Sequence, residues 1–479
     1  MQTVFVFVRI FAIILSIIGT SFLLPIGTAL AFGEYEAILP FLIPMVVAWI
    51  FGSAFYFGGK KVPVKFGTRA IFVFVSFAWV AISFYGAIPL FAGGWISDFS
   101  SAVFESVSGF TTTGATVLKD VEILPRAVNL WRMEMHWLGG MGIIALTTAV
   151  LPLLGVGGFA LVKAESTGPE KGKITPKMAN TAKALWGIYF ALTVIQTVIL
   201  MFCGMDFVDA LSHAFSTLGT GGFSSKNASI AGFNSLSTEI VCTVFMFLAG
   251  VNFSLYFYVI TGKFSELKNN SEFKAYVAIF GIVVLSLAFS LVKFYGGFGR
   301  ALRYASFQVA TIMSTTGFAT ADFMKWPAAS QFFIFILFFI GGCSGSTSGG
   351  IKVIRWVILA KKARVEMLKM IHPHGVFSVR VNGSPGREGL VLNIAPFVFL
   401  YFCLAFISTF AGTLGGLSVF ESFTASFSML GNIGPAFGPF MEYSWIPSFL
   451  KWIFSFMMIA GRLEIYNLII LFTKDFWKN

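Results

Sequence analysis

The sequence predicts an all-α integral membrane protein with four tandem helix–pore-loop–helix repeats around one pore and two extra N-terminal transmembrane helices. Of its 479 residues, 57% are apolar and 11% are charged, with a mean hydropathy of +0.85. A soluble protein has about a quarter of its residues charged. Apolar runs recur along the whole chain, and four Gly/Thr/Ser-rich segments lie between them. The bilayer must therefore be the solvent for most of the chain.

Ten segments are long and apolar enough to be transmembrane helices, which need about 20 such residues. They are 3–31, 37–58, 70–94, 130–160, 184–204, 236–262, 275–297, 328–360, 389–414 and 446–472. The first is expected to span the membrane rather than to be a cleaved signal peptide. It is too long and too apolar, and Arg9 interrupts it without an obvious cleavage site.

The net charge of +12 follows from the predicted topology. With ten spans, one side of the membrane receives the basic residues within 60–69, 163–183, 263–274, 352–387 and 474–478. Such an excess is typical of cytoplasmic loops. We therefore expect a multi-pass protein of the cell inner (plasma) membrane with both termini cytoplasmic, and no nucleic-acid partner.

The residue pattern does not indicate a disulfide framework, a metal site or a catalytic site. The four cysteines do not have the spacing of a disulfide framework or a metal site, so we expect them to be small apolar packing residues. His, Asp and Glu do not cluster with catalytic spacing, so we do not expect an enzyme. A covalent cofactor is not expected.

The four Gly/Thr/Ser-rich segments align as repeats. They are 105–114, 213–222, 308–317 and 425–434, and the glycines used to align them are Gly114, Gly222, Gly317 and Gly434. In the second, Gly221 is also a candidate, but the spacing favours Gly222. Six residues before each glycine stands a small hydroxyl residue: Ser108, Ser216, Thr311 and Ser428. Because only the glycines were chosen, this second column supports a true repeat.

The repeats divide the chain into five predicted parts. Two N-terminal transmembrane helices occupy 1–66, and pore repeats 1 and 2 occupy 67–165 and 166–268. Pore repeat 3, with a broken second helix, occupies 269–385, and pore repeat 4 occupies 386–479. The four Gly/Thr/Ser-rich segments are too short to cross the membrane, so we expect them to be re-entrant. A re-entrant segment requires that protein or water cover its backbone.

The composition of these segments suits a cation pathway. A dehydrated cation needs replacement oxygens, which inward-pointing backbone carbonyls supply. Glycine accepts the required dihedral angles at little cost, and the C-terminal end of a short helix favours a cation. The alternative is that the glycines serve close helix packing. Four such segments in the same topological position favour the pore.

The chain resembles the Trk/Ktr/HKT superfamily of potassium transporters over nearly its full length, most closely its bacterial TrkH branch. The resemblance rests on the motifs at 111–116, 220–224, 314–320 and 431–438. It implies that the carbonyls of the two residues before each filter glycine bind K⁺, namely those of Thr112, Thr113, Thr220, Gly221, Thr315, Thr316, Asn432 and Ile433. Sodium-selective relatives carry Ser at the first filter glycine, so Gly114 argues for K⁺ as the bound and transported ion.

The segment 341–350 holds five glycines and three serines, so it is expected to unwind mid-membrane. It lacks the ending of a phosphate-binding loop. The resemblance implies an intramembrane gate formed by Gly345, Ser346, Thr347, Ser348, Gly349 and Gly350, with Arg462 as a pore arginine beneath the filter. The alternatives are a tight helix crossing for the loop, and for Arg462 a snorkelling side chain or one paired with Glu464.

The resemblance also implies a homodimer and a cytoplasmic nucleotide-binding regulatory subunit. The basic stretch 352–387 is a candidate docking surface, although the positive-inside pattern or anionic lipid also explains it. The expected function is gated K⁺ uptake. An H⁺- or Na⁺-coupled K⁺ symporter is the alternative, for which Glu464 and His213 are the best proton-relay candidates.

Overall fold

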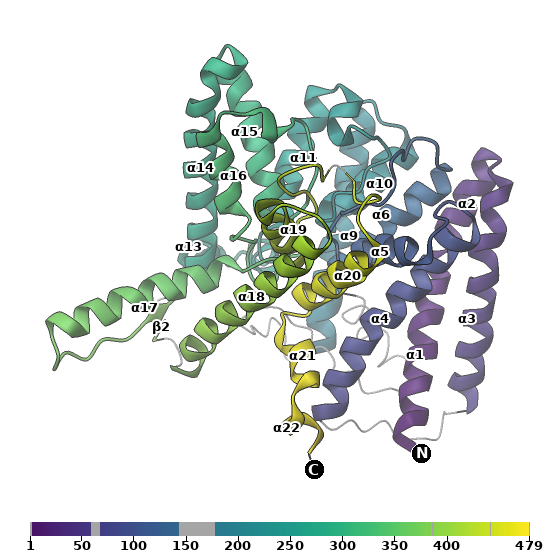
Figure 1. Cartoon of the computed structure of the whole chain (residues 1–479), viewed down its shortest axis with the longest axis horizontal. Helices are drawn as coiled ribbons and strands as arrows, with labels where there is room; N and C mark the ends of the chain where they lie inside the picture. Colours follow the sequence, from purple (N-terminus) through teal and green to yellow (C-terminus); the bar gives the residue numbers. More distant parts are fainter. Residues whose placement is uncertain are drawn as a thin grey trace.

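The structure, a computed structural model, describes residues 2–58, 68–142, 178–382, 384–385, 388–440 and 442–478. In these ranges the chain is helical except for connecting segments and one small hairpin of strands β1 (Arg380–Val381) and β2 (Ser384–Pro385). The expected all-α membrane architecture is confirmed. Figure 1 shows that the N- and C-termini lie at the same end of the molecule.

The N-terminal part forms a two-span unit at one edge of the molecule (Figure 1). Helices α1 (Gln2–Ser21) and α2 (Leu23–Phe32) make one apolar span, and α3 (Ile38–Gly58) returns beside α1. Helix α2 packs against α6, and α3 packs against α4, so this unit contacts the first of the four repeats.

Each repeat then places a short helix between a long helix and a second helix, which is interrupted in repeats 2, 3 and 4. The long helices are α4 (Thr68–Ala92), α9 (Met178–Phe202), α14 (Ser271–Tyr295) and α18 (Glu388–Leu414). The short ones are α5 (Phe99–Phe110), α10 (Phe207–Leu218), α15 (Phe298–Met313) and α19 (Val419–Gly431). The second helices begin with α6 (Arg126–Gly140), α11 (Leu236–Ala249), α16 (Ala328–Leu337) and α20 (Ser448–Arg462).

Remaining elements connect or continue these helices. They are η1 (Tyr35–Ala37), η2 (Ser229–Phe233), α12 (Phe253–Ile260), α13 (Phe264–Asn269), η3 (Phe323–Lys325), α17 (Val353–Ile371), α21 (Tyr466–Ile469), η4 (Ile470–Phe472) and α22 (Lys474–Trp477). Helix α17 extends away from the body of the molecule (Figure 1). The exact repeat boundaries stay a prediction, and the one between 165 and 166 lies outside the described residues.

Six of the ten expected spans are long, single apolar spans in the structure. The expected spans 236–262 and 446–472 are each a pair of helices with a sharp bend between them. Helices α11 and α12 meet at 94°, and α20 bends by 114° from the helical segment Tyr466–Phe472. The segment 328–360 is interrupted by the loop 338–352, in agreement with the predicted break. Of the segment 130–160, only the part up to Gly142 is described, and the basic loops 60–65 and 163–177 lie outside the description.

The two unexpected bends have different local causes. Gly250 ends α11, and Asn252 begins α12 by accepting the Ser254 N–H at 2.8 Å. After α20, Glu464 and Ile465 have φ values of 56° and 60°. A β-branched residue in this region is a true outlier, so the second bend has no sequence signal of the kind that glycine provides.

Close backbone approach holds the N-terminal unit together. The Ser16 hydroxyl of α1 lies 2.7 Å from the Ala48 carbonyl oxygen of α3. A Cβ added at Gly52 would lie 1.8 Å from Ser16 Oγ and 3.1 Å from the Ala12 carbonyl oxygen. Membrane helices use small residues for such contacts because no hydrophobic effect drives them together in lipid.

We therefore expect Gly52→Ala to destabilise the protein by about 1–3 kcal/mol, the usual cost of overpacking. The measurement is the midpoint of thermal unfolding in detergent micelles. Gly27→Ala is the matched control, because a Cβ there meets nothing within 4 Å. Equal midpoints for the two variants would show that α1 and α3 do not pack as described.

Candidate functional site

The four short helices end beside one another, and each leads into a glycine segment, defined as residues 111–114, 219–222, 314–317 and 431–434. Three of these helices begin at an oxygen-bearing cap: Asp98, Asp206 and Ser418 accept N–H groups of their own first turns. The fourth begins at Gly297 without a side-chain cap. A helix C-terminus carries partial negative charge, so all four helix ends favour a cation nearby.

The backbone of the four glycine segments is nearly identical. The residue two before each glycine has a left-handed φ: 57° at Thr112, 56° at Thr220, 57° at Thr315 and 53° at Asn432. The glycines themselves have φ values of 79° at Gly114, 85° at Gly222, 86° at Gly317 and 96° at Gly434. Such strain costs about 1–3 kcal/mol per non-glycine residue, and its recurrence at equivalent positions indicates one shared geometry.

One hydrogen bond recurs in all four segments. The N–H of the residue before the glycine donates to the carbonyl of the small hydroxyl residue five positions earlier. The N···O distances are 2.9 Å for Thr113–Ser108, 2.8 Å for Gly221–Ser216, 2.8 Å for Thr316–Thr311 and 2.9 Å for Ile433–Ser428. The column of hydroxyl residues therefore marks the last turn of each short helix.

The four segments close into a ring. A Cβ added at Gly114 would lie 1.9 Å from the Gly221 carbonyl oxygen of the next repeat, and one at Gly222 would lie 2.1 Å from that of Thr316. The series continues from Gly317 to the Ile433 oxygen (2.4 Å) and from Gly434 back to the Thr113 oxygen (2.4 Å). Each glycine thus faces a carbonyl of the following repeat. Such a ring of carbonyls is able to replace the hydration shell of a cation.

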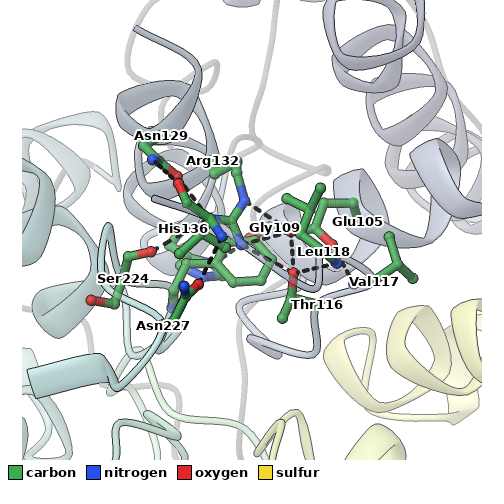
Figure 2. Close-up of polar contacts among 12 residues, drawn as sticks. Glu105, Gly109, Thr116, Val117, Leu118, Asn129, Arg132, His136, Ser224 and Asn227 are labelled. Carbon is green, nitrogen blue, oxygen red and sulfur yellow. Dashed lines mark hydrogen bonds and ion pairs between the residues drawn. The ribbon is translucent and has the colours of Figure 1, made fainter. Parts of the chain in front are cut away.

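A buried ion pair supports the first segment. Figure 2 shows Glu105 of α5 and Arg132 of α6, whose Nη2 lies 2.8 Å from Glu105 Oε1. Their side chains are 0% and 1% exposed. Glu105 also accepts the Val117 N–H at 2.8 Å and the Thr116 hydroxyl at 2.9 Å. The chain just after Gly114 is therefore held to both helices of its repeat.

The same helix α6 supports the second segment. The Arg132 guanidinium lies 4.3 Å from the centre of the Phe223 ring. His136 Nδ1 lies 2.7 Å from the Gly109 carbonyl oxygen, and its Nε2 lies 3.2 Å from the Phe223 nitrogen. Because the Phe223 N–H donates to Nε2, the imidazole proton sits on Nδ1. A Cβ at Gly221 would lie 2.0 Å from this ring, which explains why a glycine precedes Gly222, whereas the corresponding position in the other three repeats is not glycine.

Sequence reasoning did not assign Arg132 and His136 to this supporting role. Both lie in the segment 130–160, which was expected to be a transmembrane helix, where ionisable residues have structural or functional partners. Their partners lie on α5 and directly after the second glycine segment, at Phe223, and only the folded structure identifies them.

The loop 338–352 contacts the glycine segments directly. The Gly349 N–H donates to the Thr315 hydroxyl at 2.7 Å, and a Cβ at Gly349 would lie 2.4 Å from the Gly431 carbonyl oxygen. The Thr347 hydroxyl donates to the Ala249 carbonyl at 3.2 Å. Within the loop, Gly345 and Gly350 have φ values of 73° and 68°. The unwinding expected from the glycines is present, and the loop lies against repeats 2, 3 and 4.

Three further loop residues make hydrogen bonds, two within the loop and one to α12. The Ser346 hydroxyl donates to the Cys343 carbonyl at 2.6 Å, which closes a turn. The Ser348 carbonyl accepts a hydrogen bond from the buried Lys352 ammonium group. The Gly345 carbonyl accepts the Phe253 N–H at 3.0 Å, which ties the loop to α12.

Arg462 joins three repeats at the end of α20. Its Nη1 donates to the Thr347 carbonyl at 2.7 Å, and its Nη2 donates to the carbonyls of Gly139 and Gly140 at 2.6 and 2.8 Å. The alternative pairing with Glu464 is not observed, because Glu464 forms an ion pair with Arg355 of α17. Arg462 therefore contacts both the 338–352 loop and the end of α6.

The two residues considered for proton coupling have structural partners. His213 lies with Nδ1 2.7 Å from the Asp209 carbonyl oxygen and Nε2 2.9 Å from Ser224 Oγ. Glu464 pairs with Arg355. Among the described residues, no group of three or more His, Cys, Asp and Glu is placed to hold a metal ion.

Comparisons with known proteins agree on one family. The family model TrkH, described as a cation transport protein, matches residues 39–478. The Trk system potassium uptake protein TrkH of Halomonas elongata is 36% identical over 98% of both chains, and that of Escherichia coli K12 is 35% identical over 90% of this chain and 91% of its own. The crystal structure of the potassium transporter TrkH from Vibrio parahaemolyticus matches with a TM-score of 0.87 and 32% identity over 99% of both chains.

The Glu105–Arg132 pair predicts strong non-additivity. Arg132→Met leaves a buried carboxylate without its guanidinium, which costs about 3–5 kcal/mol of stability. The double variant Glu105→Gln/Arg132→Met removes both charges, so we expect it to unfold at a higher temperature than Arg132→Met. Thermal unfolding of the wild type, both single variants and the double variant measures this coupling. Additive losses would contradict a direct charge interaction.

Proposed function

The chain belongs to the TrkH family of cation transport proteins, and from this premise we propose that it takes up K⁺ through a gated filter of backbone carbonyls. It is a multi-pass membrane transporter of the Trk potassium uptake type and not an enzyme, since the relatives it matches are named potassium uptake proteins. No covalent cofactor is part of the proposal. We also propose that the protein lies in the inner membrane with both termini in the cytoplasm. The position of the two termini at the same end of the molecule (Figure 1) supports their being on one side of the membrane.

The closed ring of four glycine segments is the observation that carries the proposed filter. The carbonyls of Thr113, Gly221, Thr316 and Ile433 would form one layer of ion ligands, and those of Thr112, Thr220, Thr315 and Asn432 the next. Glycine at the four filter positions leaves space for the neighbouring carbonyl. A larger residue would have to displace backbone rather than a flexible side chain.

The proposed gate consists of the segment 345–350 together with Arg462. The loop contacts Thr315 and Gly431 from one side, and the guanidinium is bound to the Thr347 carbonyl. A positive charge held at this point would oppose the passage of cations. Movement of the loop and of Arg462 would then open the pathway.

We propose that the gate responds to a cytoplasmic nucleotide-binding regulatory subunit and that the transporter is a homodimer, as the resemblance implies. Helix α17 supports the docking of such a subunit, because it extends away from the body of the molecule (Figure 1) and carries exposed basic residues. Coupling to H⁺ or Na⁺ is not part of the proposal, since Glu464 and His213 have structural partners.

The filter predicts ion selectivity. In proteoliposomes we expect K⁺ and Rb⁺ flux to exceed Na⁺ and Li⁺ flux. Gly114→Ser should lower the K⁺/Na⁺ flux ratio by about tenfold, equal to ~1.4 kcal/mol, because a Cβ there meets the Gly221 carbonyl. Gly187→Ser, on an exposed face of α9 with open space around it, is the control. An unchanged ratio for Gly114→Ser would contradict the proposed filter.

The gate predicts that Arg462→Ala raises basal K⁺ flux severalfold, because it removes both the positive charge and the contacts with Thr347, Gly139 and Gly140. Stopped-flow measurement of K⁺ efflux from vesicles without any partner protein gives the basal rate. Arg126→Ala, which alters an exposed ion pair with Asp206, should leave it unchanged. Lower or equal flux in folded Arg462→Ala would count against the barrier.

A further inference from the structure

A single buried carboxylate holds two distant points of the gate region. Glu272 lies in the first turn of α14 and is 5% exposed. Its Oε1 accepts the Ser344 N–H at 2.7 Å and the Ile354 N–H at 3.1 Å. Ser344 belongs to the 338–352 loop, and Ile354 lies in the first turn of α17. One oxygen atom therefore links the loop to the helix that follows it.

The sequence of α17 explains the need for such a group. Lys352 occupies the N-cap position and provides no side-chain cap. The first N–H groups of a helix have no intrahelical acceptor, and the helix N-terminus carries partial positive charge. A carboxylate from α14 supplies both the missing acceptor and the favourable charge. Hydrogen bonds to a carboxylate are stronger than bonds to a neutral acceptor.

The carboxylate is itself fixed at the end of α14. Asn270 caps this helix by accepting the Phe273 N–H at 2.8 Å. Asn382, in the turn after β1, accepts the Ser271 N–H at 2.8 Å. The residue directly before Glu272 is thus bound to the hairpin that follows α17, so α14, the loop and the hairpin meet at this point.

We propose that Glu272 is the positioning residue that keeps the gate loop in its observed conformation, an inference that rests on the proposed role of segment 345–350 as the gate. Glu272 contacts the backbone at Ser344, one residue before that segment, and the first turn of α17 after it. Loss of this acceptor removes the partner of the Ser344 N–H and of the Ile354 N–H together. The loop then leaves the glycine segments more often.

The native Cys343 reports loop movement without reference to ion flux. It is 1% exposed and precedes Ser344. In a variant whose Cys203, Cys242 and Cys403 are replaced by alanine, the rate of reaction with a small hydrophilic maleimide measures how often the loop opens. We compare Glu272→Ala, Glu272→Gln and the control Glu266→Ala, an exposed glutamate on α13, in lipid nanodiscs, and measure basal K⁺ flux in proteoliposomes.

We expect Glu272→Ala to react about tenfold faster or more, because two charge-assisted bonds are lost. Glu272→Gln retains an acceptor oxygen but loses the charge, so its rate should lie between those of Glu266→Ala and Glu272→Ala, an order that a merely destabilised protein would not reproduce. Equal rates for Glu272→Ala and Glu266→Ala overturn the inference, whatever the flux. A faster reaction with unchanged basal flux supports the positioning role and overturns the gate in the proposed function.

If Glu272→Ala does not fold, Glu272→Asp takes its place. The shorter side chain keeps the charge but withdraws the acceptor by one methylene group. Faster labelling of the Asp variant than of the Gln variant supports positioning through the acceptor oxygen. Equal labelling of these two variants overturns it.

Discussion

The structure depends on the contact between the last glycine of each glycine segment and the carbonyl of the next repeat. The four contacts run from repeat 1 to 2, 2 to 3, 3 to 4 and 4 back to 1, so they close the ring only if all four segments share one geometry. This requirement explains why a left-handed residue recurs at Thr112, Thr220, Thr315 and Asn432 despite its cost. Strain of this kind persists only where the surrounding structure over-determines the backbone.

The surroundings differ between repeats although the ring does not. In repeat 1 the ion pair of Glu105 and Arg132 holds the chain after Gly114. In repeat 2 the His136 ring occupies the space next to Gly221. In repeat 4 the Asn432 amide donates to the Thr113 hydroxyl at 3.0 Å and to the Met458 carbonyl at 2.9 Å. The same backbone geometry therefore recurs with different side chains around it. Different polar side chains are able to supply the hydrogen bonds that hold each segment in place.

The sequence predicted those features that have local causes. The aligned glycines and hydroxyl residues predicted the four segments. A positive φ and a nearby carbonyl require glycine, and the hydroxyl residue lies in the last turn of the helix before it. The unwound loop followed from its glycines. The bend at Glu464 and Ile465 was missed, since two residues that disfavour this conformation adopt it. Glu272 was missed because its partners lie 72 and 82 positions away, and no spacing rule connects them.

The proposed filter and the proposed gate differ in how many contacts each must break to move. The glycine segments are joined to their own helices and to both neighbouring repeats, so one cannot shift without the others. The 338–352 loop is tied to its surroundings by separate polar contacts, among them those of Ser344, Gly345, Thr347 and Gly349. A neutral hydrogen bond contributes only about 0.5–1.5 kcal/mol. A binding partner that shifts the loop from 99% closed to 99% open must supply ~5.5 kcal/mol. Breaking a few of the loop's hydrogen bonds, including the stronger one to the Glu272 carboxylate, costs an energy of this order, whereas movement of the ring would break the contacts of all four glycine segments at once.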